Sequence, residues 1–145
     1  MKLTSRALNT CLIAVLTLPA VPAAMAEDSF KARKNLLQAA RDFTSQGYRM
    51  RGEPYVSHLD HQATQRIKIQ FSKGSSYAVV LVCDQYCSRA DLALSNNAGG
   101  DVDIEQKDRS IVAVTPRETA TLGIQVTMTD CSENPCYYSI GIFAK

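Results

Sequence analysis

The sequence has no large excess of either charge, few histidines and no apolar run long enough to cross a membrane. A membrane span needs about 20 apolar residues, whereas the apolar run Cys11–Leu18 is shorter and is followed by Pro19 and Pro22. Sixteen bases against 14 acids give none of the basic excess that favours nucleic acid. With two histidines and no Gly-x-Ser-x-Gly motif, the sequence offers few candidates for a nucleophile with a positioned base. We therefore expect no nucleic-acid partner. We also expect no membrane span once the N-terminal segment, interpreted below as a signal peptide, is removed.

Residues 1–26 have the composition of a cleavable signal peptide. Lys2 and Arg6 precede the apolar run, and Ala24–Ala26 gives the small-x-small pattern that a signal peptidase accepts. Acidic Glu27 follows directly. We expect cleavage after Ala26, which leaves 119 residues as a single periplasmic or secreted domain and removes Cys11. A membrane anchor is the alternative interpretation of the same segment.

The charges that remain after residue 26 are balanced in number but unevenly distributed. All 14 acids and 14 of the 16 bases lie after residue 26. Residues 27–73 hold nine bases and five acids, and residues 74–145 hold five bases and nine acids. This asymmetry can steer a charged partner toward the protein. We favour the simpler interpretation, in which the two halves attract each other within one fold.

Four cysteines follow the signal peptide, in two closely spaced pairs. An even number in an exported chain of this size predicts two disulfides. Zinc is the alternative, but structural zinc sites usually space paired ligands more tightly. Three connectivities are open, and we favour the local pairs, each of which closes a short loop between strand-like segments. The predicted pairs are Cys83 with Cys87, and Cys131 with Cys136.

A helix followed by an irregular segment is expected before the strands begin. Residues 28–46 are rich in helix formers, with Asp28 or Ser29 as a cap and Gly47 as a stop. An apolar stripe is predicted at near-helical spacing, and it contains Phe30, Leu37, Ala40 and Phe43. We expect the stripe to pack on the rest of the domain, with partner binding as the alternative. Residues 47–63, which include Gly52 and Pro54, are interpreted as a connection.

From Gln65 the apolar residues recur with a period of two, which is typical of strands. Turn signals such as Asn96–Gly100 separate seven short apolar or alternating segments. The expected strands are 65–71, 77–83, 91–95, 102–105, 111–115, 121–129 and 137–143. We therefore predict a mainly β fold, an antiparallel β-sandwich preceded by one short helix.

Four stretches of the sequence resemble the pre-peptidase C-terminal (PPC) domain, in an exported bacterial branch with paired cysteines. They are Tyr77–Cys87, Asp91–Leu94, Val114–Pro116 and Cys131–Tyr138, within a match from about Gln65 to Lys145. The resemblance implies a jelly-roll-like sandwich for residues 64–145, behind a helix and connecting segment at 27–63. Such domains are usually non-catalytic appendages of secreted enzymes or small stand-alone exported proteins.

The sequence departs from the PPC pattern at two places. Arg89 stands where the family tends to have an acid, so a calcium site at Asp91 is not expected. Ala120 and Leu122 replace the glycine and tyrosine that the family often has in a turn. Both departures are compatible with the predicted fold.

Two groups of residues are candidates for metal binding or catalysis. His58, Asp60 and His61 can bind zinc or relay a proton, but the segment offers no third ligand and we interpret them as surface residues. Asp101, Asp103 and Glu105 can offer oxygens to calcium. On an alternating strand the same acids share one solvent face, which is the interpretation we favour. We predict no metal, no cofactor and no catalytic residue.

The predicted function is that of a small exported, non-catalytic module that binds another protein or a cell-envelope polymer. A periplasmic inhibitor or immunity-type protein is the alternative, because small size and export suit it equally. A metal-dependent hydrolase that uses His58 and His61 is a third hypothesis. The sequence does not identify the partner.

Overall fold

The computed structural model describes residues 23–97, 99–108 and 110–145 of the chain. Within these residues one helix precedes nine strands. The helix α1 spans Ala23–Ser45. The strands are β1 Arg49–Met50, β2 Tyr55–Leu59, β3 Thr64–Phe71, β4 Tyr77–Cys83, β5 Cys87–Ser95, β6 Val102–Asp108, β7 Ile111–Pro116, β8 Ala120–Cys131 and β9 Cys136–Ala144. Cys11 and the rest of the segment 1–22 lie outside the described residues.

The strands form two antiparallel sheets, which confirms the predicted β-sandwich. The larger sheet has the order β1-β9-β4-β7-β6, with β2 also paired to β9, and the smaller has the order β3-β8-β5. In β8 the side chains alternate between the core and the outer face, as the period of two predicts. The continuous apolar strand β4 lies between β9 and β7, where both of its faces are covered. The core between the sheets includes Phe71, Val79, Leu122, Ile124 and Tyr138.

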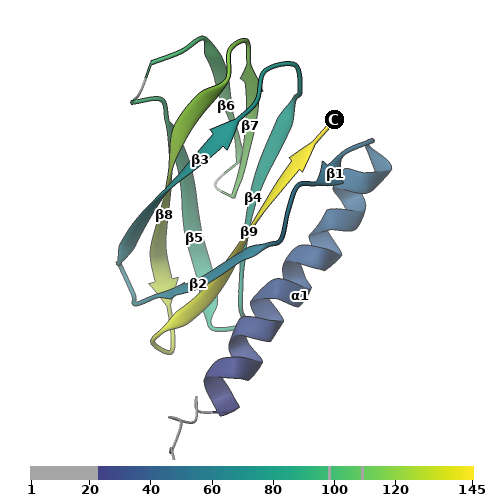
Figure 1. The fold of residues 1–145 in the computed structure, drawn as a ribbon. Coiled ribbons are helices and arrows are strands. Elements are labelled where there is room, and N and C mark those ends of the chain that lie inside the picture. The colour runs from purple at the N-terminus through teal and green to yellow at the C-terminus, as the bar shows by residue number, and fades with distance from the viewer. Residues whose placement is uncertain (1–22, 98, 109) are drawn as a thin grey trace, which may run out of the picture.

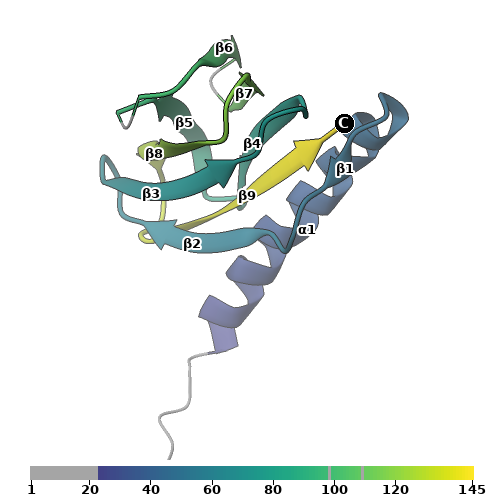
Figure 2. The ribbon, with the colours of Figure 1, turned by 45° about the horizontal axis from the view of Figure 1, so that its top comes forward.

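Helix α1 forms a third layer on the outer face of the larger sheet (Figures 1 and 2). Leu36, which is fully buried, packs there with Ala78, Val80 and Phe143. Burying a leucine side chain contributes about 1.5–3 kcal/mol. The ring of Phe43 also stacks on Phe143, with 5.0 Å between ring centroids. The helix is therefore packed as an integral part of the fold.

The helix differs from the sequence prediction at its start. It begins at Ala23, five residues before Asp28, so the expected capping role of Asp28 or Ser29 is wrong. The hydroxyl of Ser29 donates instead to the carbonyl of Ala26 at 3.0 Å. The C-terminal end agrees with the prediction: Gly47 has a φ of 89°, a left-handed conformation that favours glycine.

The interpretation of residues 47–63 as an irregular connection is wrong, because β1 and β2 lie in this segment. Both strands pair with β9, and Tyr55 lies opposite Ile140. These strands are short and carry exposed residues such as Arg49 and His58, so they lack the strict alternation that identifies longer strands. Their position is fixed by pairing with the buried strand β9.

Both predicted disulfides are present in the structure. Cys83 is bonded to Cys87 across the β4–β5 turn, and Cys131 to Cys136 across the β8–β9 turn. Each bridge closes a loop of about five residues, which contributes about 2 kcal/mol on the chain-entropy model. The bridges therefore fix two turns at the same end of β4 and β9.

Candidate functional site

The outward face of α1 carries two exposed apolar residues and two bases. Phe30, Lys34, Leu37 and Arg41 follow the i, i+4, i+7, i+11 spacing that places side chains on one helix face. Phe30 is 64% exposed and Leu37 is 49% exposed. The two bases are exposed as well. We call these four residues the α1 stripe.

The α1 stripe corrects the apolar stripe expected from the sequence. The expected set joined Phe30 and Leu37 to Ala40 and Phe43, but the positions drift around the helix over this length because the period is 3.6 residues. The face that packs on the sheet is centred on Leu36, with Ala40 and Phe43 beside it. Phe30 and Leu37 therefore point away from the domain.

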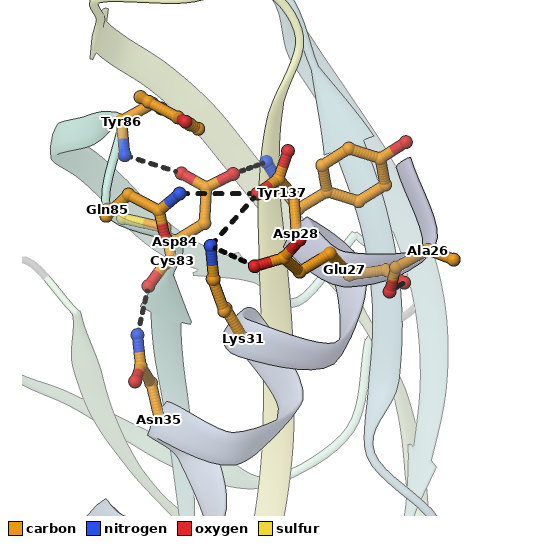
Figure 3. Close-up of polar contacts among 11 residues, drawn as sticks. Ala26, Glu27, Asp28, Lys31, Asn35, Cys83, Asp84, Gln85, Tyr86 and Tyr137 are labelled. Carbon is orange, nitrogen blue, oxygen red and sulfur yellow. Dashed lines mark hydrogen bonds and ion pairs between the residues drawn. The ribbon is translucent and has the colours of Figure 1, made fainter. Parts of the chain in front are cut away.

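Polar contacts hold the first half of α1 against the β4–β5 turn (Figure 3). The side-chain amide of Asn35 donates to the Cys83 carbonyl at 2.9 Å, and the side-chain amide of Gln85 donates to the Asp28 carboxylate at 3.3 Å. Lys31 forms an ion pair with Glu27 at 2.9 Å, and this hydrogen bond raises the pKa of Lys31. The helix is thus fixed near its start, which gives the α1 stripe a defined orientation.

Asp84 organises the disulfide loop from inside the protein. The residue is 4% exposed, and its two side-chain oxygens accept hydrogen bonds from the backbone amides of Tyr86 at 3.0 Å and Tyr137 at 2.7 Å (Figure 3). The Asp84 amide also donates to the Tyr137 carbonyl at 2.9 Å. Both carboxylate oxygens therefore already have backbone partners, and the residue acts as a structural anchor.

The histidine group does not form a common site in the described residues. The His58 ring lies 5.3 Å from the Tyr137 ring, whereas the Nδ1 atom of His61 accepts a hydrogen bond from the Cys131 amide at 3.2 Å. The His61 amide donates to Asn134, which ties this turn to the second disulfide loop. Among residues 23–97, 99–108 and 110–145, no three His, Cys, Asp or Glu side chains are grouped to hold a metal ion.

The acids near β6 form ion pairs with neighbouring bases. Arg117 contacts Asp101 at 2.9 Å and Asp103 at 2.7 Å, and Lys107 contacts Glu105 at 2.5 Å. All three acids are exposed, while the alternate residues Val102 and Ile104 pack against the core. This is the solvated face that the alternation predicts. The pairing with Arg117, 14 residues beyond Asp103, had no signal in the sequence.

Two surface hollows lie at opposite ends of β4. The larger, about 440 Å³, is lined by Asn35, Val82 and Arg89 among others, but Arg89 has Asp91 at 3.6 Å beside it. The other, about 260 Å³, is lined by Arg49, Met50, Arg51, Ser75, Ala144 and Lys145. The sequence did not single out these bases, because two of them lie in the segment interpreted as a connection.

Comparison of the chain with models of protein families, with curated proteins and with solved structures finds no match. The PPC resemblance therefore remains a prediction from the sequence. In the part of the chain that the structure describes, α1 is the single helix, and it is not apolar enough to cross a membrane.

Proposed function

We propose that this protein is a small exported, non-catalytic β-sandwich module that binds another protein through the α1 stripe. The observation that carries the proposal is the exposure of Phe30 and Leu37 on one face of a helix whose opposite face is docked. Large apolar side chains that gather on an exposed surface mark interaction sites more often than single ones do. The docked helix is already ordered, which lowers the entropic cost of binding.

The charges of the α1 stripe define the chemistry of the partner. Lys34 and Arg41 flank Leu37, and neither forms an ion pair with a described acidic side chain. A second copy of the same stripe would bring these bases toward each other. An apolar groove with acidic residues at its rim complements both the apolar and the basic side chains. We therefore propose a protein partner of this kind.

Export is supported by the two disulfides, which are typical of an oxidising compartment. The proposed cleavage after Ala26 leaves Glu27 and Asp28 in the first turn of α1, where negative charge is favourable. The PPC resemblance also implies an exported, non-catalytic module. Intact mass of periplasmic protein should lack residues 1–26, and a retained segment would contradict the proposed processing.

The contacts of the histidines support a non-catalytic role. A proton relay through His61 would first have to break the hydrogen bond from the Cys131 amide to its Nδ1 atom. A hydrolase that uses His58 and His61 is accordingly not our proposal. An inhibitor or immunity protein remains a form of the same binding function, since its partner would also dock on a protein surface.

The proposal is tested by affinity capture from envelope extract, with four forms of the purified protein. The variants Phe30→Ser/Leu37→Ser and Lys34→Glu/Arg41→Glu remove the apolar and the basic parts of the α1 stripe. Arg66→Glu/Lys68→Glu makes the same charge change on β3, where both side chains are exposed. We expect both stripe variants to lose roughly tenfold or more in capture of a discrete protein, and the control to retain it.

Two outcomes would contradict the proposal. Equal capture by all four forms would show that the α1 stripe does not bind the partner. Sedimentation that shows a dimer, converted to monomer by Phe30→Ser/Leu37→Ser, would identify a second copy of this chain as the occupant instead.

A further inference from the structure

Three cations surround the 260 Å³ hollow at the end of the larger sheet, and we call it the basic hollow. Arg49 and Arg51 come from β1 and the residue after it, and Lys145 follows β9. Strand β1 and the C-terminal residue lie side by side in both views (Figures 1 and 2). Ser75, from the turn between β3 and β4, completes the polar lining.

Backbone pairing brings these side chains together. Arg49 lies opposite Ala144, and the amide of Arg51 donates to the Ile142 carbonyl at 2.7 Å. The two arginines are two residues apart, so they point to one side of the strand. Met50, between them, also lines the hollow and packs near Leu36. The site is therefore built on paired strands and not on a loose loop.

The last residue is fixed on both sides. The Ser76 amide donates to the main-chain oxygen of Lys145 and the Lys145 amide donates to the Ser76 carbonyl, both at 3.0 Å, which ties this end of the chain to the β3–β4 turn. The Nζ atom of Lys145 lies 4.6 Å from the centroid of the Tyr48 ring, a cation–π contact. Both contacts hold Lys145 at the edge of the basic hollow.

The cations of the basic hollow are not neutralised by neighbouring side chains. Within the described residues, Arg49, Arg51 and Lys145 form no ion pair with an Asp or Glu side chain, although five other bases do. Three unpaired cations around one hollow favour an anion, and guanidinium groups match the geometry of phosphate and carboxylate oxygens. A ligand with a single negative charge would leave part of the local positive charge uncompensated.

We propose that the basic hollow is a binding site for an oxyanion that carries two or more negative charges, phosphate or carboxylate. This site is separate from the α1 stripe and does not depend on the proposed protein partner. Arg49 and Arg51 bind the oxyanion through charge-assisted hydrogen bonds, Lys145 adds a third cation, and the Ser75 hydroxyl donates at the rim.

The proposal is tested by isothermal titration calorimetry of the protein purified from periplasm, at low salt. The probes are pyrophosphate, citrate and, as a monovalent control, acetate. We expect saturable 1:1 binding of pyrophosphate or citrate, and acetate to bind roughly tenfold or more weakly. The probe that binds more tightly assigns the ligand as a phosphate or as a carboxylate. Failure of both to saturate would overturn the proposal.

A matched pair of variants locates the site. Arg49→Gln/Arg51→Gln should weaken binding roughly tenfold or more, because it removes both guanidinium groups. Arg66→Gln/Lys68→Gln removes the same charge from β3 and should leave binding unchanged. Equal weakening by both variants would show diffuse attraction and would overturn the site. All four side chains are exposed, so thermal unfolding should confirm that both variants fold.

Discussion

Asp84 is the buried residue on which the geometry of the disulfide loop depends most directly. Two backbone amides donate to its carboxylate. We predict that Asp84→Ala lowers the free energy of unfolding by about 3 kcal/mol, because both amides lose a charged acceptor at a buried position. Urea unfolding measures the change.

The control for this prediction is Asp130→Ala. Asp130 accepts a hydrogen bond from Ser88 but is exposed, so water replaces the lost partner. We expect a loss of about 1 kcal/mol or less. Similar losses in the two variants would contradict the anchoring role of Asp84.

Tyr138 makes the stability of the protein depend on pH in the alkaline range. Its side chain is fully buried, and its hydroxyl donates to Gln65 at 2.5 Å. Burial raises the pKa of Tyr138 from 10.0 to about 12. The unfolded chain therefore releases this proton first as pH rises, so stability is complete below pH 10 and falls between pH 10 and about 12.

Urea unfolding across this pH range measures the effect. Tyr138→Phe should show a shallower loss of stability, because it has no hydroxyl to ionise. An identical slope in the variant would mean that Tyr138 does not cause the pH dependence.

At the scale of elements, long alternating or continuous apolar segments could be predicted from the sequence, and short paired segments could not. Strands β3 and β4 were predicted within one residue of their bounds, because their side-chain patterns reflect burial directly. Strand β1 has only two residues and depends on pairing with β9, a contact more than 90 residues away in the chain. No local pattern encodes such a contact.

The helix illustrates the same limit for the candidate site. Its existence and its termination before Gly47 could be predicted from the sequence. The face that docks could not be predicted, because it depends on the residues that the sheet presents to the helix. Leu36 docks because Gly141 on β9 leaves room for it: a Cβ atom built at Gly141 would lie 3.0 Å from both Leu36 Cδ atoms. The exposure of Phe30 and Leu37 is the consequence.

We predict that Gly141→Ala destabilises the protein by about 1–3 kcal/mol, the usual cost of overpacking. The new Cβ atom would also lie 2.8 Å from Phe143, so α1 or the Phe143 ring must move. Hydrogen exchange should show faster exchange of the α1 amides. In the control Gly123→Ala, the nearest atom is the Ser95 hydroxyl oxygen at 3.0 Å, which can rotate away. Equal effects of the two substitutions would contradict close packing at Gly141.

At the scale of the whole molecule, three layers place the two proposed surfaces apart. The smaller sheet covers one face of the larger sheet, and α1 covers the other. The α1 stripe faces outward from the helix, and the basic hollow lies at the end of the sheet. The basic character of residues 27–73 contributes to both, since Lys34, Arg41, Arg49 and Arg51 all belong to that half.

The α1 stripe is tested most directly by site-specific photo-crosslinking in living cells. A photoreactive residue at position 37 lies on the stripe, and one at position 125 lies on the outer face of the smaller sheet as a control. We predict one discrete crosslinked protein from position 37 that disappears with Phe30→Ser, and no such product from position 125. No product from position 37, a product from position 125 alone, or a crosslink to a second copy of this chain would contradict it.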